Sequence, residues 1–362
     1  FGLAAAVFAP RVLPETDRHT GELDVPGALT ATAGLLSIVY GLTRAGDERY
    51  GWGDTWTITA LVGGAALVGI FALIESRVEH PLLPFAILRN KTRVVAFAVM
   101  MIAPAAMFAM FFFLSLFIQL VAGYSPLKTG LAFLPFSFGM VFAATTSSKL
   151  ISKVDPRYIS GVGTLMTATA LFMFHRITVP EDGASILATL PAELGGQGLP
   201  LAHDLNYWTQ IFPWVLLMSV GMGFNFVPLT LVALHRLRTE DSGIGSGVLN
   251  TMQQVGGALG LATLSTVSLH FASDRAKELA PGVLEAAGKA GLDKAMTSSK
   301  LHETVGQLSS LGAFTEGATK AFLTGSGMML VASAIVWIFL DVSHQEMAGD
   351  ADEHPEAGVH VG

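Results

Sequence analysis

Eight long segments of this chain contain no Asp, Glu, Lys or Arg, and this pattern constrains the fold more than any other feature. They cover residues 25–43, 56–74, 94–121, 129–148, 158–174, 208–234, 243–270 and 321–340. Charged residues make up only 14% of the 362 residues and fall between these segments. A charge in lipid hydrocarbon costs several kcal/mol unless it is paired or hydrated, and a membrane helix needs roughly 20 apolar residues. The chain is therefore predicted to be an all-α polytopic membrane protein, with 25–43 and 158–174 the weakest spans.

Lys and Arg are divided unevenly between alternate loops. The short loops of one side hold eleven of them, and the short loops of the other side hold four. Cytoplasmic loops carry the excess, so the first set is predicted to lie inside. This places loop 274–320 outside, either as short amphipathic helices or as a flexible loop, and the acidic tail 341–362 in the cytoplasm. Residues 1–10 are interpreted as the end of a truncated span, and 11–24 as a cytoplasmic linker.

Composition excludes several function classes. The chain has no cysteine, so it has no disulfide, thiolate metal site or cysteine nucleophile. A net charge of −7 argues against nucleic acid as a partner. His344, His354 and His360 lie in the acidic tail, where a disordered, solvated segment is a better interpretation than a metal site. With no phosphate-binding lysine loop and no serine nucleophile motif, we expect neither an enzyme nor a nucleotide, metal or other cofactor.

A glycine-rich segment, 243–260, is the most distinctive part of the chain. Gly243, Gly247, Asn250, Gln254 and Gly257 recur at spacings of four and three, so on a helix they form one stripe. Gly256 and Gly260 form a GxxxG pair next to it. Small residues let two membrane helices approach closely, and amides can hydrogen-bond across such a contact. Pure helix packing and a moving, functional contact both fit this pattern.

Prolines and polar residues inside other spans suggest a ligand-facing wall. Pro104 and Gln119 fall in span 94–121, Pro135 interrupts 129–148, and Asn225 and Pro228 fall together in 208–234. A proline frees a backbone carbonyl, which is tolerated beside protein or a watery cavity. A packing kink explains each proline equally well.

The run 107–113 is rich in Met and Phe, which can repack around varied apolar ligands, although a core or lipid-facing stripe is the commoner meaning. The candidate ligand contacts are Met107, Phe111, Gln119 and Asn225.

Three motifs resemble the fourteen-span drug:proton antiporters of the major facilitator superfamily. They are LVAGYSPLKTGLAFLP at 120–135, GSGVLNTMQQVGGALG at 245–260, and DVPGAL at 24–29 followed by YGLTRAG at 40–46. The resemblance implies that 25–74 are two extra central helices and that 94–340 form the C-terminal six-helix half of a transporter. It also implies that spans 94–121 and 208–234 line the central cavity. The expected contact with the absent N-terminal six-span half comprises Gly247, Asn250, Gln254, Gly256, Gly257 and Gly260.

The implied function is proton-coupled efflux of amphipathic drugs or antibiotics by alternating access in the bacterial inner or plasma membrane. The expected partners are a small amphipathic molecule, protons, the lipid bilayer and the missing half. None of the six spans from 94–121 onward contains Asp, Glu, Lys or Arg, so the proton-binding group is expected upstream, and this chain alone is not expected to transport. Export of an endogenous metabolite or siderophore is one alternative. A truncated or partner subunit that does not transport is another.

Overall fold

The protein is described here by a computed structural model that places residues 24–47, 49–78, 81–83, 87–180, 182–190, 200–235, 237, 242–292 and 298–346. These residues form helices and connecting segments, with no strand among them. The predicted truncated span, almost all of the linker that follows it, and the tail after residue 346 lie outside this description. The same holds for His354 and His360.

The helices follow the predicted spans closely. The two extra helices are α2 (Val25–Gly46) and α3 (Thr55–Glu75). The bundle contains α4 (Lys91–Leu116) with its π-helical continuation η2 (Phe117–Val121), α5 (Pro126–Ala132), α6 (Leu134–Leu150), α7 (Pro156–His175), α9 (Tyr207–Gln210), α10 (Phe212–Leu234), α11 (Ser242–Lys289) and α13 (Ser298–Phe339). Two short connectors are η1 (Ile87–Arg89) and α8 (Gly183–Leu187).

Seven of the eight predicted spans are helices long and apolar enough to cross a membrane. The eighth is α7. It has 20 residues, but it is less apolar because its fully buried face carries Ser160, Thr164 and Thr167.

Local sequence signals set where helices begin. The Asp54 side chain accepts a hydrogen bond from the Thr57 backbone N–H at 3.0 Å and caps α3. The Ser125 hydroxyl accepts one from the Lys128 N–H at 3.3 Å, directly before Pro126 at the first position of α5. An N-cap hydroxyl and a proline in the first turn both favour a helix start.

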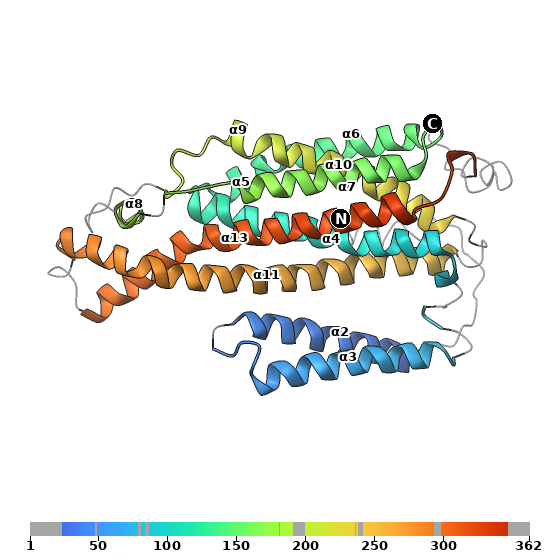
Figure 1. Ribbon diagram of the computed structural model, residues 1–362, viewed down its shortest axis with the longest axis horizontal. Helices are drawn as coiled ribbons and strands as arrows, with labels where there is room; N and C mark the ends of the chain where they lie inside the picture. Colours follow the sequence, from blue (N-terminus) through green and yellow to red (C-terminus); the bar gives the residue numbers. More distant parts are fainter. Residues whose placement is uncertain are drawn as a thin grey trace, which may run out of the picture.

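The bundle helices pack side by side around a common apolar core (Figure 1). α10 packs between α6 and α7, and α13 contacts α7, α11 and α4. Polar groups join the helices at points of close approach. The Ser326 hydroxyl of α13, for example, donates to the Ala168 carbonyl of α7 at 2.8 Å. Hydrogen bonds of this kind, together with small residues, hold membrane helices together where apolar burial against lipid cannot.

α11 and α13 extend well beyond one end of the bundle (Figure 1). A 48-residue helix such as α11 is about 72 Å long, more than twice the thickness of a hydrocarbon core. Its second half packs on the first half of α13 and on α8, and buries Ile186, Val283 and Leu308 between them. Loop 274–320 is thus neither flexible nor built of separate short helices in its described part. In the predicted topology this end of the bundle faces outward, and we call it the outer end.

The hairpin of α2 and α3 lies against α11 at one side of the bundle (Figure 1). Gly34 and Gly64 bring its two helices into backbone contact, because a Cβ on either one would lie within about 3 Å of the opposite helix. The Thr266 hydroxyl of α11 donates to the Leu42 carbonyl of α2 at 2.8 Å. The hairpin is therefore attached to the bundle near its outer end.

Candidate functional site

The glycine-rich segment forms the first part of α11 and packs on α4 of the same bundle. A Cβ at Gly256 would collide with the Met101 backbone carbonyl, and one at Gly260 would collide with Ala105. The GxxxG pair therefore provides the close approach that its spacing indicates. Its partner is a helix of this chain.

Gly257 faces the aromatic ring of Phe108 on α4, where a Cβ would clash with the ring. The assignment of Gly256, Gly257 and Gly260 to a contact with the other half is therefore corrected. A helix face that is filled by α4 cannot also meet an upstream domain. The spacing revealed a tightly packed face, but it could not identify the partner.

A second face of α11 remains open. Gly247, Asn250 and Gln254 are exposed, and nothing lies within 4 Å of a Cβ built on Gly247. Amide side chains are rarely left facing hydrocarbon in membrane helices and mark protein contacts or water-filled cavities. For these three residues a contact with the other half remains a prediction.

Met107 and Phe111 lie one turn apart on α4 and are both partly buried against the main core. The Phe111 ring packs against Phe133 at 5.2 Å and Phe136 at 4.8 Å between centroids. These two rings belong to the turn between α5 and α6 and to the start of α6, where the chain bends as Pro135 predicted. The Met/Phe run thus provides both core packing and a partly open aromatic surface.

Gln119 lies in the π-helical turn that ends α4, is partly exposed, and makes no hydrogen bond to the other described residues. Single π-turns occur frequently at functional sites. Here the turn is followed by Gly123, whose φ of +68° only glycine adopts easily. Gln119 is thus free to contact a ligand at the outer end.

Asn225 is fully buried on α10. Its amide donates to the Gly221 carbonyl at 3.0 Å, and its Oδ1 atom has no partner among the described residues. Gly221 itself lies against α7, near Thr167. Contact between Asn225 and a ligand would therefore require α10 to move away from α7, and the structure does not bring Asn225 to the surface that Met107 and Phe111 share.

A polar network at the inner end was not apparent from the sequence. Arg93, near the start of α4, is 6% exposed. Its guanidinium donates to the carbonyls of Ala233 at 3.0 Å, Ile87 at 3.2 Å and His235 at 2.8 Å. It thereby ties α4 to the end of α10. The sequence shows only a basic residue beside a span, which fits the topology rule equally well.

The chain after α13 folds back onto α7 at the same end. Both the backbone N–H and the ring Nδ1 of His344 lie 2.7 Å from Asp155 Oδ1. These two contacts hold the pKa of Asp155 below its ordinary value. Part of the predicted cytoplasmic tail is therefore ordered on the bundle.

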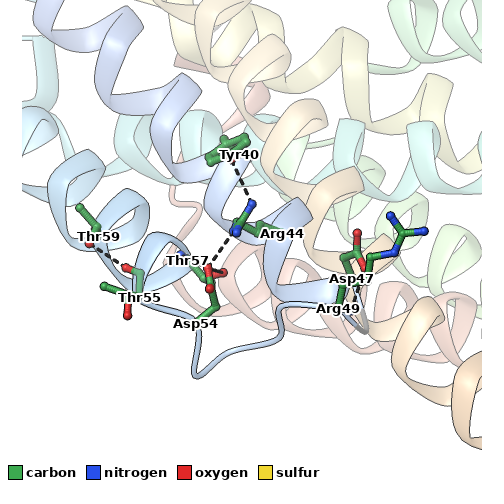
Figure 2. A network of polar contacts seen from close by, with 8 residues as sticks. All are labelled: Tyr40, Arg44, Asp47, Arg49, Asp54, Thr55, Thr57 and Thr59. Atoms are coloured by element: carbon green, nitrogen blue, oxygen red, sulfur yellow. Dashed lines mark hydrogen bonds and ion pairs between the residues drawn. The ribbon is translucent and has the colours of Figure 1, made fainter.

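A third polar network closes the outer turn of the extra hairpin (Figure 2). Arg44 Nε donates to Asp54 Oδ2 at 2.8 Å, and the Arg44 guanidinium lies 3.5 Å from the centre of the Tyr50 ring. The hydrogen bond from Arg44 lowers the pKa of the Asp54 carboxyl, and those from Thr57 add to the effect. The residues come from both ends of one short turn, so this network is local.

The fold and these surfaces define a multi-pass α-helical membrane protein whose GxxxG pair packs its own helices. Residues 2–261 match the model of the Major Facilitator Superfamily, and the chain belongs to that family.

Several relatives are named for resistance or export. The chain is 34% identical to the puromycin resistance protein pur8 of Streptomyces alboniger over 73% of this chain and 48% of that protein. It is 30% identical to the cephamycin export protein CmcT of Amycolatopsis lactamdurans, over 77% of this chain and 53% of that protein. It is 28% identical to the tetracenomycin C resistance and export protein of Streptomyces glaucescens, over 74% of this chain and 45% of that protein. The chain spans about half the length of these relatives.

Proposed function

We propose that this chain is the C-terminal half, with two extra helices, of a proton-coupled exporter of amphipathic drugs or antibiotics. The observation that carries the proposal is membership of the Major Facilitator Superfamily together with relatives named for resistance to, or export of, antibiotics. The assignment to the fourteen-span antiporters rests on the hairpin α2–α3, which supplies two helices in addition to the six of the bundle.

In the proposed mechanism the two halves rock about a site near the middle of the membrane. The open face of α11, with Gly247, Asn250 and Gln254, contacts the other half. Met107 and Phe111 supply the adaptable apolar wall, and Gln119 supplies an amide near the outer mouth. The proton-binding carboxylate belongs to the other half, because the membrane-spanning parts of the six bundle helices contain no Asp or Glu.

The test uses the full-length protein in a drug-hypersensitive bacterium and in proteoliposomes. We expect it to lower the accumulation of puromycin, lincomycin or ethidium in cells, and to move at least one of them in ATP-free proteoliposomes when a proton gradient is imposed. A protonophore should abolish that flux. Equal accumulation with and without the protein, together with no gradient-driven flux, would refute export. Flux that persists with the protonophore would refute proton coupling alone.

A matched pair of variants tests the assigned wall. Phe111→Ala should change the ranking of substrates, since it removes an adaptable ring. Phe172→Ala is the control, because Phe172 is an exposed phenylalanine of α7 outside the proposed wall. If both variants behave like the parent protein, the wall lies elsewhere.

A further inference from the structure

A cavity of about 990 Å³ opens at the outer end between four parts of the chain. The end of α2 with its following turn, the second half of α11 and the first half of α13 form its sides, and Leu120 of η2 adds to the lining. Its volume is in the range of sites that bind drug-sized ligands.

The interior of the cavity is apolar. Leu120, Leu269, Leu311 and Phe314 line it, and small residues such as Ala276 leave the space open. An apolar space at this end would accept an acyl chain or another hydrophobic body.

One buried hydroxyl in the lining is unused. Ser309 lines the cavity and is only 2% exposed, and its Oγ atom has no hydrogen-bond partner among the described residues. Buried hydroxyls are nearly always paired in folded proteins. Its Oγ atom is itself shielded from the cavity, so Ser309 contributes to the packing of the lining rather than a donor to a ligand.

Two cations and one carboxylate, Arg49, Lys277 and Asp47, also line the cavity. Asp47 already accepts a hydrogen bond from the Arg49 backbone N–H at 2.9 Å, and Lys277 lies 3.4 Å from Asp274. The Arg49 guanidinium has no ion pair or hydrogen bond to the described residues. Figure 2 shows its side chain extending away from the Arg44–Asp54 pair, so that pair does not occupy it.

Lys277 is paired with Asp274, so the Arg49 guanidinium is the cation of this described lining that is available to an anion. A guanidinium matches the geometry of carboxylate and phosphate groups. We propose that this cavity is a binding site for an amphipathic anion, with its carboxylate or phosphate on Arg49 and its apolar part among Leu269, Leu311 and Phe314. The ligand is either an anionic lipid of the outer leaflet or a soluble amphipathic acid. The proposal does not depend on proton-coupled export.

The experiment uses the full-length protein in phosphatidylcholine nanodiscs and 11-(dansylamino)undecanoate, a fluorescent fatty acid, with empty nanodiscs as the background. We expect saturable binding of the acid, and binding of its primary amide at least about ten-fold weaker, the factor expected for one lost charge-assisted hydrogen bond. Arg49→Gln should weaken binding of the acid by a similar factor and leave binding of the amide unchanged. Ala276→Trp should abolish binding of both by filling the cavity.

Arg77→Gln is the matched control, because Arg77 is an exposed arginine at the opposite end of the hairpin and does not line the cavity. Thermal unfolding of each variant establishes that it is folded.

Replacing part of the phosphatidylcholine with phosphatidylglycerol distinguishes an anionic lipid from a soluble acid as the ligand. Displacement of the probe identifies a lipid site, and unchanged binding identifies a site for a soluble acid. Equal affinity for the acid and the amide, or binding to Ala276→Trp as strong as to the parent, would overturn the proposal.

Discussion

The most apolar stretches of α3 and of α4 with η2 have equal mean hydropathy, yet they are buried to very different extents. Only 11% of the most apolar stretch of α3 is buried inside the protein, against 61% for α4. Trp56, Ile58 and Val62 of α3 are exposed, whereas Val99, Met100 and Leu114 of α4 are fully buried. Hydropathy thus reports that a helix lies in the membrane. The number of helices that pack against it decides whether it belongs to the bundle or to its periphery: α4 contacts α10, α11 and α13, whereas α3 packs mainly on α2.

The largest effect that follows from this comparison is expected for a bulky residue at the α4–α11 contact. Gly256→Leu should destabilise the bundle by about 3 kcal/mol or more, because the new side chain would meet the Met101 backbone, which cannot rotate away. The measurement is thermal unfolding in detergent, together with drug efflux per unit of membrane protein.

Gly63→Leu in α3 is the matched control, since nothing lies within 4 Å of a Cβ at Gly63. It should leave the unfolding temperature nearly unchanged. Equal destabilisation by both changes would show that the hairpin is packed as tightly as the bundle. Gly257→Leu should lower the unfolding temperature by an intermediate amount, because the Phe108 ring can rotate away from the new side chain.

A smaller effect is expected at the inner end. Arg93→Ala should cost about 2 kcal/mol, because it removes charge-assisted hydrogen bonds and leaves the carbonyls of Ala233 and Ile87 without their donor. Denaturant or thermal unfolding measures the loss. Arg77→Ala, an exposed arginine of the hairpin, is the control and should change little. An unaffected Arg93→Ala protein would mean that water satisfies those carbonyls.

The Asp155–His344 contact should break without unfolding the bundle. The pKa of Asp155 is held below its ordinary value. The contact therefore stabilises the tail fully at pH values above the ordinary pKa of aspartate, and this stabilisation is lost as the pH falls through the lowered pKa. Asp155→Asn removes the negative charge at neutral pH, as protonation of the carboxyl does at low pH. A cysteine introduced by Val342→Cys, at a position now 9% exposed, should then react a few-fold faster with a thiol reagent.

The control for that measurement is Asp47→Asn at the outer end, which should not change the reactivity at position 342. If Asp155→Asn also leaves the thiol reaction rate unchanged, the tail is held by Leu340 and Val342 alone.

The smallest effect is expected for the Arg44–Asp54 pair. Both partners are partly covered but lie in a turn at the protein surface, where ion pairs contribute little to stability. Asp54→Asn should speed amide hydrogen exchange in the turn after α2 and leave the unfolding temperature of the bundle unchanged. A lower unfolding temperature would show that the hairpin and the bundle unfold as one unit.

Spans and helix starts could be predicted because their causes are local. Absence of charge over about 20 residues identified eight spans, all of which are helical, and the local capping by Ser125 and Pro126 accounts for the start of α5. The candidate site was harder to predict. Gly256 and Gly260 revealed close packing through their spacing, but both α4 and an upstream domain fitted that pattern. Asn225 was noticed as a polar residue in a span, and its burial toward α7 depends on how α10 is rotated.

The sequence by itself determined that this chain is an all-helical membrane protein, because the cost of burying charge in lipid acts on each segment independently of the rest. The tertiary structure alone decided that α11 and α13 continue as one packed extension, since Val283 and Leu308 are buried where α11, α13 and α8 pack together. It also decided the outer cavity, to which Arg49, Ala276 and Phe314 come from three separate elements. Packing partners distant along the chain leave no periodicity in any one segment, and only the folded arrangement brings them together.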